Sequence, residues 1–234
     1  MEIEKLFKTD PALYADMESF LRSGEWRIAH ESPTALLLHW KHDWLYALAA
    51  FDPEEARDLL ARIPLDRVVV PRGFEGLREL AAERGFTGSN PCRQAVYEKT
   101  EPVPVRTELT IRRPDGKDYP KFRETYDMGS EDELREAFFG PDFLGGYLGD
   151  ELVGYIGVHG EGAMGMLHVF EPFRRRGYAE AIYASLINSQ IQKGRLPYAQ
   201  VIEGNEASLS LQRKLGFTVS EGLLYWMWRA PEKE

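Results

Sequence analysis

Three consecutive arginines followed by a glycine, from Arg174 to Gly177, give this chain its clearest capacity to bind an anion. The apolar residues after Gly177 keep the spacing of a helix with one buried face, and Gly194 ends that run. The start of a helix presents unpaired backbone N–H groups and the positive end of the helix dipole. A glycine there lets the backbone approach a phosphate, and arginines donate charge-assisted hydrogen bonds. The stretch therefore predicts a site for an anion, and a diphosphate fits it best.

A second stretch downstream places an asparagine at the start of a helix. A predicted strand over 198–202 leads to Gly204 and Asn205, and a helix over 206–215 then ends at Gly216. A plainer interpretation is also open, in which the arginines form a solvated basic turn and the last glycine is an ordinary helix C-cap. That interpretation explains neither the spacing of the two stretches nor the asparagine.

Together the two stretches resemble the acyl-CoA-dependent N-acyltransferases of the GNAT superfamily. The first matches that family's pyrophosphate loop, (Gln/Arg)-x-x-Gly-x-(Gly/Ala), at Arg174, Gly177 and Ala179. The second follows the family pattern Asn-x-x-(Ala/Ser)-x-x-Leu-Tyr-x-Lys-x-Gly-Phe, with matches at Asn205, Ser208, Leu211, Lys214, Gly216 and Phe217. One position departs, because Gln212 replaces the family's tyrosine. Two motifs in their expected contexts are more specific than either alone.

The resemblance implies acetyl-CoA, or another acyl-CoA, as co-substrate. In the family, the strand before the loop ends in a valine, here Val169, and its backbone pairs with the pantetheine arm. The residues that the resemblance assigns to the coenzyme are Leu167, Val169, Arg174, Arg175, Arg176, Gly177, Tyr178, Ala179, Asn205 and Ser208.

Acyl transfer to an amine needs a base, and in this family the base is often a glutamate on the strand before the loop. Counting back from Arg174 puts that position at Ala163, and the nearest carboxylate is Glu161, which shares the same face if the strand extends that far. His168 ranks second, with an ordinary pKa of about 6.5 that suits proton transfer. Two structural interpretations stay open: a surface charge of a hairpin for the glutamate and a hydrogen-bonded strand residue for the histidine.

Gln212 cannot give the departing thiolate the proton that the family's tyrosine supplies. Tyr225 or a water could substitute, or the thiolate leaves unprotonated, since a thiol with a pKa of about 8.5 is a tolerable leaving group. Catalysis would then depend on positioning and on a backbone N–H that polarises the thioester carbonyl.

The implied activity is transfer of an acetyl or short acyl group from acyl-CoA to a primary amine, by direct transfer in a ternary complex. A small-molecule amine is the first choice of acceptor. The departures from the family pattern keep open a non-catalytic acyl-CoA sensor or regulatory protein. A protein N-terminal acetyltransferase is a third candidate, because an α-amino group with a pKa of about 8 is easily deprotonated.

The composition is that of an ordinary globular protein, with 234 residues, 43% of them hydrophobic. A net charge of −9 argues against a broad nucleic-acid surface, which needs many basic residues on one face. One cysteine, Cys92, excludes an internal disulfide framework, and without clustered His or Cys partners no metal site is expected. The sequence shows no signal peptide and no apolar run of about 20 residues, so we expect a cytoplasmic protein without a membrane anchor. A homodimer stays open.

The resemblance implies an α/β (α+β) fold of two GNAT-like units, each a mixed, mostly antiparallel sheet flanked by helices, and the periodicity of the sequence predicts where its elements lie. Predicted helices cover 11–21, 53–62, 75–83, 117–126 and a segment from 130, where Ser130 and Glu133 suggest a capping box. Predicted strands cover 26–30, 35–40, 44–51, 68–70, 107–112, a strand ending at 148, then 151–158, 166–169 and 223–228. These elements must bring the arginine loop and the candidate bases to one place.

An internal repeat suggests two GNAT-like units. Without gaps, 68–89 matches 199–220 at eight positions, and both copies keep Gly-Phe-Thr-x-Ser. We expect a degenerate domain at 1–103 and a catalytic domain at 104–234, joined near Pro102 and Pro104. The first copy has no arginine-glycine loop. This layout resembles that of glycine N-acyltransferase and its relatives.

Overall fold

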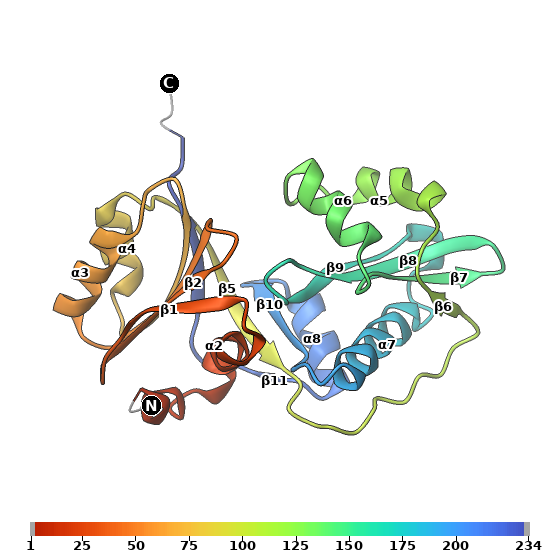
Figure 1. The fold of residues 1–234 in the computed structure, drawn as a ribbon. Coiled ribbons are helices and arrows are strands. Elements are labelled where there is room, and N and C mark those ends of the chain that lie inside the picture. The colour runs from red at the N-terminus through yellow and green to blue at the C-terminus, as the bar shows by residue number, and fades with distance from the viewer. Residues whose placement is uncertain (1–2, 232–234) are drawn as a thin grey trace. The chain divides into compact units, whose positions relative to one another are not determined.

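The computed structural model describes residues 3–231, which divide into two compact units. Unit 1 comprises 1–95, 201–209 and 218–234, and unit 2 comprises 96–200 and 210–217. Each unit is a sheet flanked by helices, which confirms the predicted mixed α/β class with mostly antiparallel sheets (Figure 1). Within residues 3–231, no helix is both long and apolar enough to cross a membrane.

Unit 1 is built on antiparallel strands joined to one parallel pair. Its strand order is β1-β2-β3-β4-β12-β5, and β10 follows β5 in the same sheet. The elements are α1 (Glu4–Phe7), α2 (Pro11–Ser23), β1 (Trp26–Glu31), β2 (Ala35–Trp40), β3 (Leu45–Ala50), α3 (Pro53–Arg62), β4 (Val68–Gly73), α4 (Leu77–Arg84), β5 (Gly88–Val96) and β12 (Leu224–Trp228). β10 (Tyr198–Ile202) and α8 (Glu206–Leu215) each cross the boundary between the two ranges of residues, and β11 (Thr218–Val219) pairs with β5.

The core of unit 1 lies between the sheet and the helices α3 and α4. Leu37, Leu48 and Val69 from the strands pack there with Leu59 and Leu60 of α3. β3 and β4 run parallel and stay paired along their whole length, from Leu45 to Ala50 on β3. β3 and β4, the two strands that α3 connects, are therefore paired without a gap between them.

Unit 2 is a four-stranded antiparallel sheet with helices on both faces. Its strand order is β6-β7-β8-β9, and α5 and α6 lie on one face with α7 on the other (Figure 1). The elements are β6 (Thr110–Arg112), η1 (Gly116–Asp118), α5 (Tyr119–Thr125), α6 (Glu131–Phe139), β7 (Leu144–Leu148), β8 (Glu151–Val158), β9 (Met164–Val169), η2 (Glu171–Phe173) and α7 (Tyr178–Gln192).

An aromatic core joins α5 and α6 to the sheet of unit 2. It contains Phe122, Phe138, Phe143 and Tyr155, all nearly inaccessible to solvent. The capping box predicted at the start of α6 is confirmed, because the Ser130 hydroxyl and the Glu133 carboxylate each bond the other residue's backbone N–H. This core fixes one face of β8 and β9.

Three details differ from the expectations. No strand is predicted over Gly88–Val96, where the structure has β5, because Asn90 and Pro91 are unfavourable in strands. β9 begins at Met164, so Glu161 lies in the turn before it and not on the strand. β12 lies between β4 and β5, so unit 1 includes the last predicted strand, whereas the expected division falls once, after residue 103. A strand's pattern of apolar residues does not specify its neighbours.

Asp142 holds the end of α7 and gives the first prediction. Its carboxylate, 14% exposed, accepts hydrogen bonds from Gln190, Lys193 and Arg195. Burial alone would raise the pKa of Asp142, but these hydrogen bonds lower it below 3.8. We expect Asp142→Asn to reduce the free energy of unfolding at pH 7 by about 1–3 kcal/mol.

The pH dependence of that loss follows from the lowered pKa. The stabilisation is present above the unfolded-state value of 3.8 and disappears as the pH falls through the lower folded-state pKa. Urea unfolding at pH 7 and near pH 3 measures it. Asp66→Asn is the matched control, because Asp66 is 70% exposed in its pair with Arg67 and should change stability by at most about 0.5 kcal/mol. Equal effects of the two substitutions would contradict the prediction.

Candidate functional site

The loop between β9 and α7 turns sharply before the helix begins. The η2 turn closes with hydrogen bonds from Phe173 N–H to Phe170 O at 2.9 Å and from Arg174 N–H to Glu171 O at 3.2 Å. Arg175 and Gly177 then adopt the left-handed region, with φ of 64° and 80°. These two residues aim the chain so that α7 starts at Tyr178. A left-handed arginine is uncommon, and nothing in the sequence predicted it.

The start of α7 is open to an anion. Its first backbone hydrogen bond runs from Ala181 N–H to Gly177 O at 3.1 Å, so the amides before Ala181 have no partner within the helix. No side chain caps the helix, and a Cβ built on Gly177 would meet nothing within 4 Å. Three exposed arginines, at 174–176, directly precede this point in the chain. The residues present therefore fit a diphosphate held by amides and guanidinium groups.

Arg174 also fastens the loop to the strand. Its Nε donates a hydrogen bond to Val169 O at 3.0 Å, so that carbonyl already has a partner within the chain. The guanidinium keeps its remaining N–H groups for another acceptor. The Arg176 guanidinium lies 5.9 Å from the Phe173 ring centroid. The resemblance expects the Val169 backbone to pair with the pantetheine arm; here its carbonyl already accepts the hydrogen bond from Arg174.

The start of α3 in unit 1 shows the opposite chemistry. Asp52 caps that helix, accepting a hydrogen bond from Glu55 N–H at 2.8 Å, and Glu54 adds a further carboxylate in the first turn. The Glu55 carboxylate in turn bonds His30 and Thr34. Carboxylates thus occupy the positive end of the α3 dipole and repel an anion. Of α3 and α7, the helices that follow β3 and β9, α7 alone is open at its start.

β9 carries a β-bulge in front of the loop. Tyr155 of β8 pairs with His168, whereas Gly157 pairs with Gly165, so β9 has one residue more than β8 between these pairs. Met166 within the bulge has a φ of 60°, which is strained for a side chain of its size. A bulge leaves backbone N–H or C=O groups outside the ladder and redirects side chains, and such sites are common beside active sites.

His168 lies between the bulge and the loop. Its imidazole stacks on Tyr155 at 5.6 Å between ring centroids and meets the edge of Phe170 at 5.2 Å. Within the described residues no group forms a hydrogen bond with this imidazole. Burial first, and then the charge of Arg174, lower the pKa of His168 below 6.5. The imidazole is therefore neutral near pH 7 and able to accept a proton.

Glu161 lies in the turn between β8 and β9, and its backbone carbonyl accepts a hydrogen bond from the Tyr198 hydroxyl at 2.9 Å. Its charge contributes to the raised pKa of Tyr126, behind the larger effect of burial. Because Glu161 lies in this turn, it does not lie on the strand that leads into the loop, as the choice of Glu161 as base assumed.

The other predicted residues lie on different elements. Asn205 accepts a hydrogen bond from Ser208 N–H through its side-chain oxygen at 3.1 Å, which caps the start of α8. Gln212 is buried in α8, with 2% of its surface exposed. Tyr225 belongs to β12 of unit 1, where it packs on the α3–α4 core with the Arg78 guanidinium 5.8 Å from its ring centroid. The roles of these residues toward the coenzyme or the reaction stay predictions.

Gly154 on β8 is required for the close approach of β9 and α7, which gives the second prediction. A Cβ there would lie 2.7 Å from His168 O and 3.2 Å from Ile182 Cδ1. We expect Gly154→Ala to lower the free energy of unfolding by about 1–3 kcal/mol through overpacking. Thermal or urea unfolding measures this, with Gly116→Ala as the control, since its Cβ would meet nothing nearer than 3.6 Å. An undiminished stability of Gly154→Ala would contradict the prediction.

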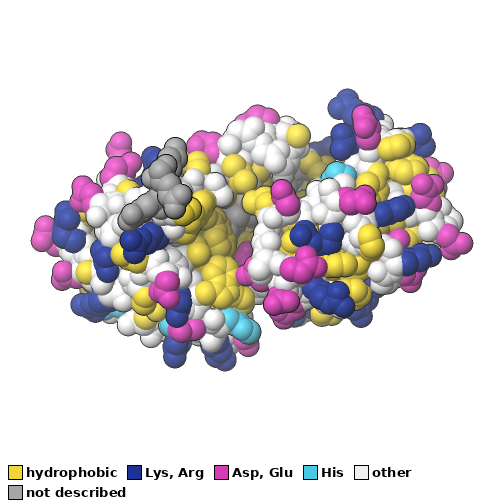
Figure 2. All heavy atoms as spheres, turned by 90° about the horizontal axis from the view of Figure 1, so that it is seen from above, with side chains coloured by type: hydrophobic (Ala, Val, Ile, Leu, Met, Phe, Trp, Pro, Cys, Tyr) yellow, Lys and Arg dark blue, Asp and Glu magenta, His cyan; other side chains and the backbone are white. Residues whose placement is uncertain are grey.

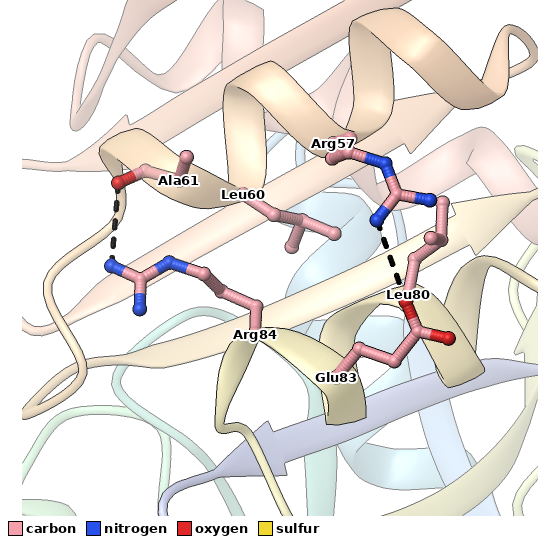
Figure 3. Close-up of a pocket in the computed structure, with 6 residues that line it drawn as sticks. All are labelled: Arg57, Leu60, Ala61, Leu80, Glu83 and Arg84. Carbon is pink, nitrogen blue, oxygen red and sulfur yellow. Dashed lines mark hydrogen bonds and ion pairs between the residues drawn. The ribbon is translucent and has the colours of Figure 1, made fainter.

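A pocket between α3 and α4 of unit 1 offers no comparable chemistry. Its lining consists of Arg57, Leu60, Ala61, Leu80, Glu83 and Arg84. The polar groups there bond one another, since Arg57 pairs with Glu83 at 3.4 Å and Arg84 donates to Ala61 O at 3.3 Å (Figure 3). On the face seen in Figure 2, basic and acidic side chains are interspersed and form no broad basic area.

Comparison with known proteins supports the fold. A family model described as FR47-like protein matches residues 145–227, from β7 to β12. No curated protein sequence matches the chain.

Similar solved structures span nearly the whole chain. A Drosophila protein has a TM-score of 0.63 with 19% identity, covering 95% of this chain and 89% of that one. A GCN5-related N-acetyltransferase from Kribbella flavida has a TM-score of 0.59 with 17% identity, covering 94% and 95%. A GCN5-related N-acetyltransferase-like protein from Streptococcus suis has a TM-score of 0.55 with 16% identity, covering 97% and 98%. At these identities the likeness concerns the fold, which is that of the GNAT acetyltransferases.

Proposed function

We propose that this chain, with its GNAT acetyltransferase fold, transfers an acetyl or short acyl group from acyl-CoA to a primary amine, by direct transfer in a ternary complex. The observation that carries the proposal is the uncapped start of α7, directly preceded in the chain by three exposed arginines. The coenzyme would be held there by its diphosphate, and it supplies an acyl group activated as a thioester. A small-molecule amine is the proposed acceptor.

His168 is the proposed base. An amine with a pKa of about 10.4 costs about 4.6 kcal/mol to deprotonate at pH 7, so a base decides which acceptors react. The neutral imidazole of His168 has no hydrogen-bond partner in the described structure, so a ring nitrogen is available to accept the ammonium proton. Glu161 is the alternative, acting through water from the turn.

Backbone groups of β9 complete the proposed mechanism. The bulge at Met166 leaves part of the β9 backbone outside the ladder with β8, and an N–H there would polarise the thioester carbonyl. The departing sulfur takes its proton from a water or leaves as the thiolate. Positioning by the loop and the strand then supplies most of the acceleration.

Residues 1–103 are proposed to be a degenerate GNAT-like copy of residues 104–234. Both segments follow the order of three strands, helix, strand, helix and strand: β1 to β5 with α3 and α4 in the first, and β7 to β11 with α7 and α8 in the second. The closed β3–β4 pair and the carboxylates at α3 support the view that the first copy holds no coenzyme.

The test is release of free CoA thiol from acetyl-CoA in the presence of a broad panel of amines. Amine-dependent release supports the enzyme, with small amines and peptide N-termini compared in the same panel. Coenzyme binding by calorimetry without release for any amine supports the alternative, a non-catalytic sensor. Absence of both binding and release would overturn the proposal.

A further inference from the structure

The segment that leads into β6 lies along α7 and is fastened at both ends. At one end the Asn188 side chain bonds both backbone groups of Val103, accepting from its N–H at 2.8 Å and donating to its O at 2.9 Å. At the other end the Tyr178 hydroxyl donates to the Glu108 carboxylate at 2.5 Å. We call residues 103–108 the strap; Figure 1 shows it running past α7 to β6.

The lengths of the strap and the helix agree. From Tyr178 to Asn188 the helix advances about 15 Å at 1.5 Å per residue. From Val103 to Glu108 an extended chain covers about 17 Å. The strap has no secondary structure of its own, and it runs antiparallel to α7. Leu109, just beyond the strap, is buried and anchors its end beside β7, close to Gly146.

The Glu108 bond holds the residue that starts the anion site. Tyr178 follows Gly177 directly and is the first residue of α7, with only 4% of its surface exposed. The bond to Glu108 first, and then burial, raise the pKa of the Tyr178 hydroxyl, and a smaller effect of Arg176 opposes them. The left-handed residues before Tyr178 have no capping side chain to hold them.

We propose that Glu108 is a positioning residue: through Tyr178 it fixes the first turn of α7 so that the loop amides are aimed at the coenzyme diphosphate. The inference rests on the proposed function. Glu108 touches no substrate, and its effect appears as coenzyme affinity.

The experiment measures CoA affinity by calorimetry, with the KM for acetyl-CoA and kcat measured alongside. We expect Glu108→Ala and Tyr178→Phe each to weaken CoA about three- to tenfold and to raise KM equally, with kcat unchanged. The double substitution should weaken CoA binding no more than either single substitution does, because both remove the same hydrogen bond. Glu108→Gln keeps an oxygen that accepts the hydrogen bond from the Tyr178 hydroxyl, and this variant should keep most of the affinity.

Tyr119→Phe is the matched control, because the Tyr119 hydroxyl makes an equivalent 2.5 Å bond to Glu131 elsewhere in unit 2. Its CoA affinity should equal that of the unsubstituted protein. Unchanged affinity in Glu108→Ala and Tyr178→Phe, or failure of Glu108→Gln to differ from Glu108→Ala, would overturn the inference alone. Absence of CoA binding by the unsubstituted protein would overturn the proposed function together with it.

Discussion

Replacing His168 by glutamine is expected to lower kcat about 10²- to 10⁴-fold, the range of a well-placed general base. Glutamine keeps a polar group of similar size on β9 but cannot accept a proton at neutral pH. The CoA affinity should stay unchanged, because the loop and the start of α7 are untouched. Steady-state kinetics with a reactive amine, with calorimetry for CoA, measures both quantities.

The pH profile gives a second, independent readout. The base works only when neutral, so kcat/KM should fall as the pH drops below the pKa of His168, which lies under 6.5. His168→Gln should lose this acidic limb. His159→Gln is the matched control, because His159 lies in the turn before β9, and it should keep both rate and profile. A large loss in Glu161→Gln with a normal His168→Gln would assign the base to Glu161.

Replacing Gly177 by valine is expected to weaken CoA binding at least tenfold. Its φ of 80° is unfavourable for any L-residue by about 1–2 kcal/mol, and a β-branched side chain is affected most. The new side chain would also occupy the open space at the start of α7, where a phosphate would lie. Calorimetry at moderate salt measures the dissociation constant.

Gly149→Val separates this effect from general strain. Gly149 also has a positive φ, 59°, and a Cβ there would likewise meet nothing within 4 Å. Both substitutions should lower thermal stability by similar amounts, but only Gly177→Val should change the affinity. Equal CoA affinity in the two variants would remove the basis for placing the diphosphate at α7.

Most elements of the fold could be predicted from local signals. The helices at 53–62 and 206–215 and the strands at 151–158 and 198–202 begin and end at the predicted residues, because caps, prolines and glycines mark them in the sequence. The neighbours of each strand could not be predicted in this way. β12 pairs with β4 and β5, and this pairing depends on contacts between residues more than 100 positions apart.

The parts of the candidate site that depend on residue type and spacing could be predicted from the sequence. The parts that depend on the conformation of the backbone could not. The arginines and Gly177 are visible in the sequence as a basic loop before a helix. The bulge at Met166 has no sequence signal, because methionine adopts a positive φ only when the surrounding structure imposes it. Glu108 was also missed, since an isolated carboxylate 70 residues from Tyr178 gives no hint of the bond between them.

The place of β12 within unit 1 has a consequence for synthesis on the ribosome. Residues 96–200 emerge before β12 does, so β4 and β5 cannot pair with β12, the strand between them in the sheet, until it has been synthesised. During that interval both strands present unpaired backbone groups, which favour association with other chains. The nascent chain would therefore need protection from self-association for longer than a domain completed by contiguous residues.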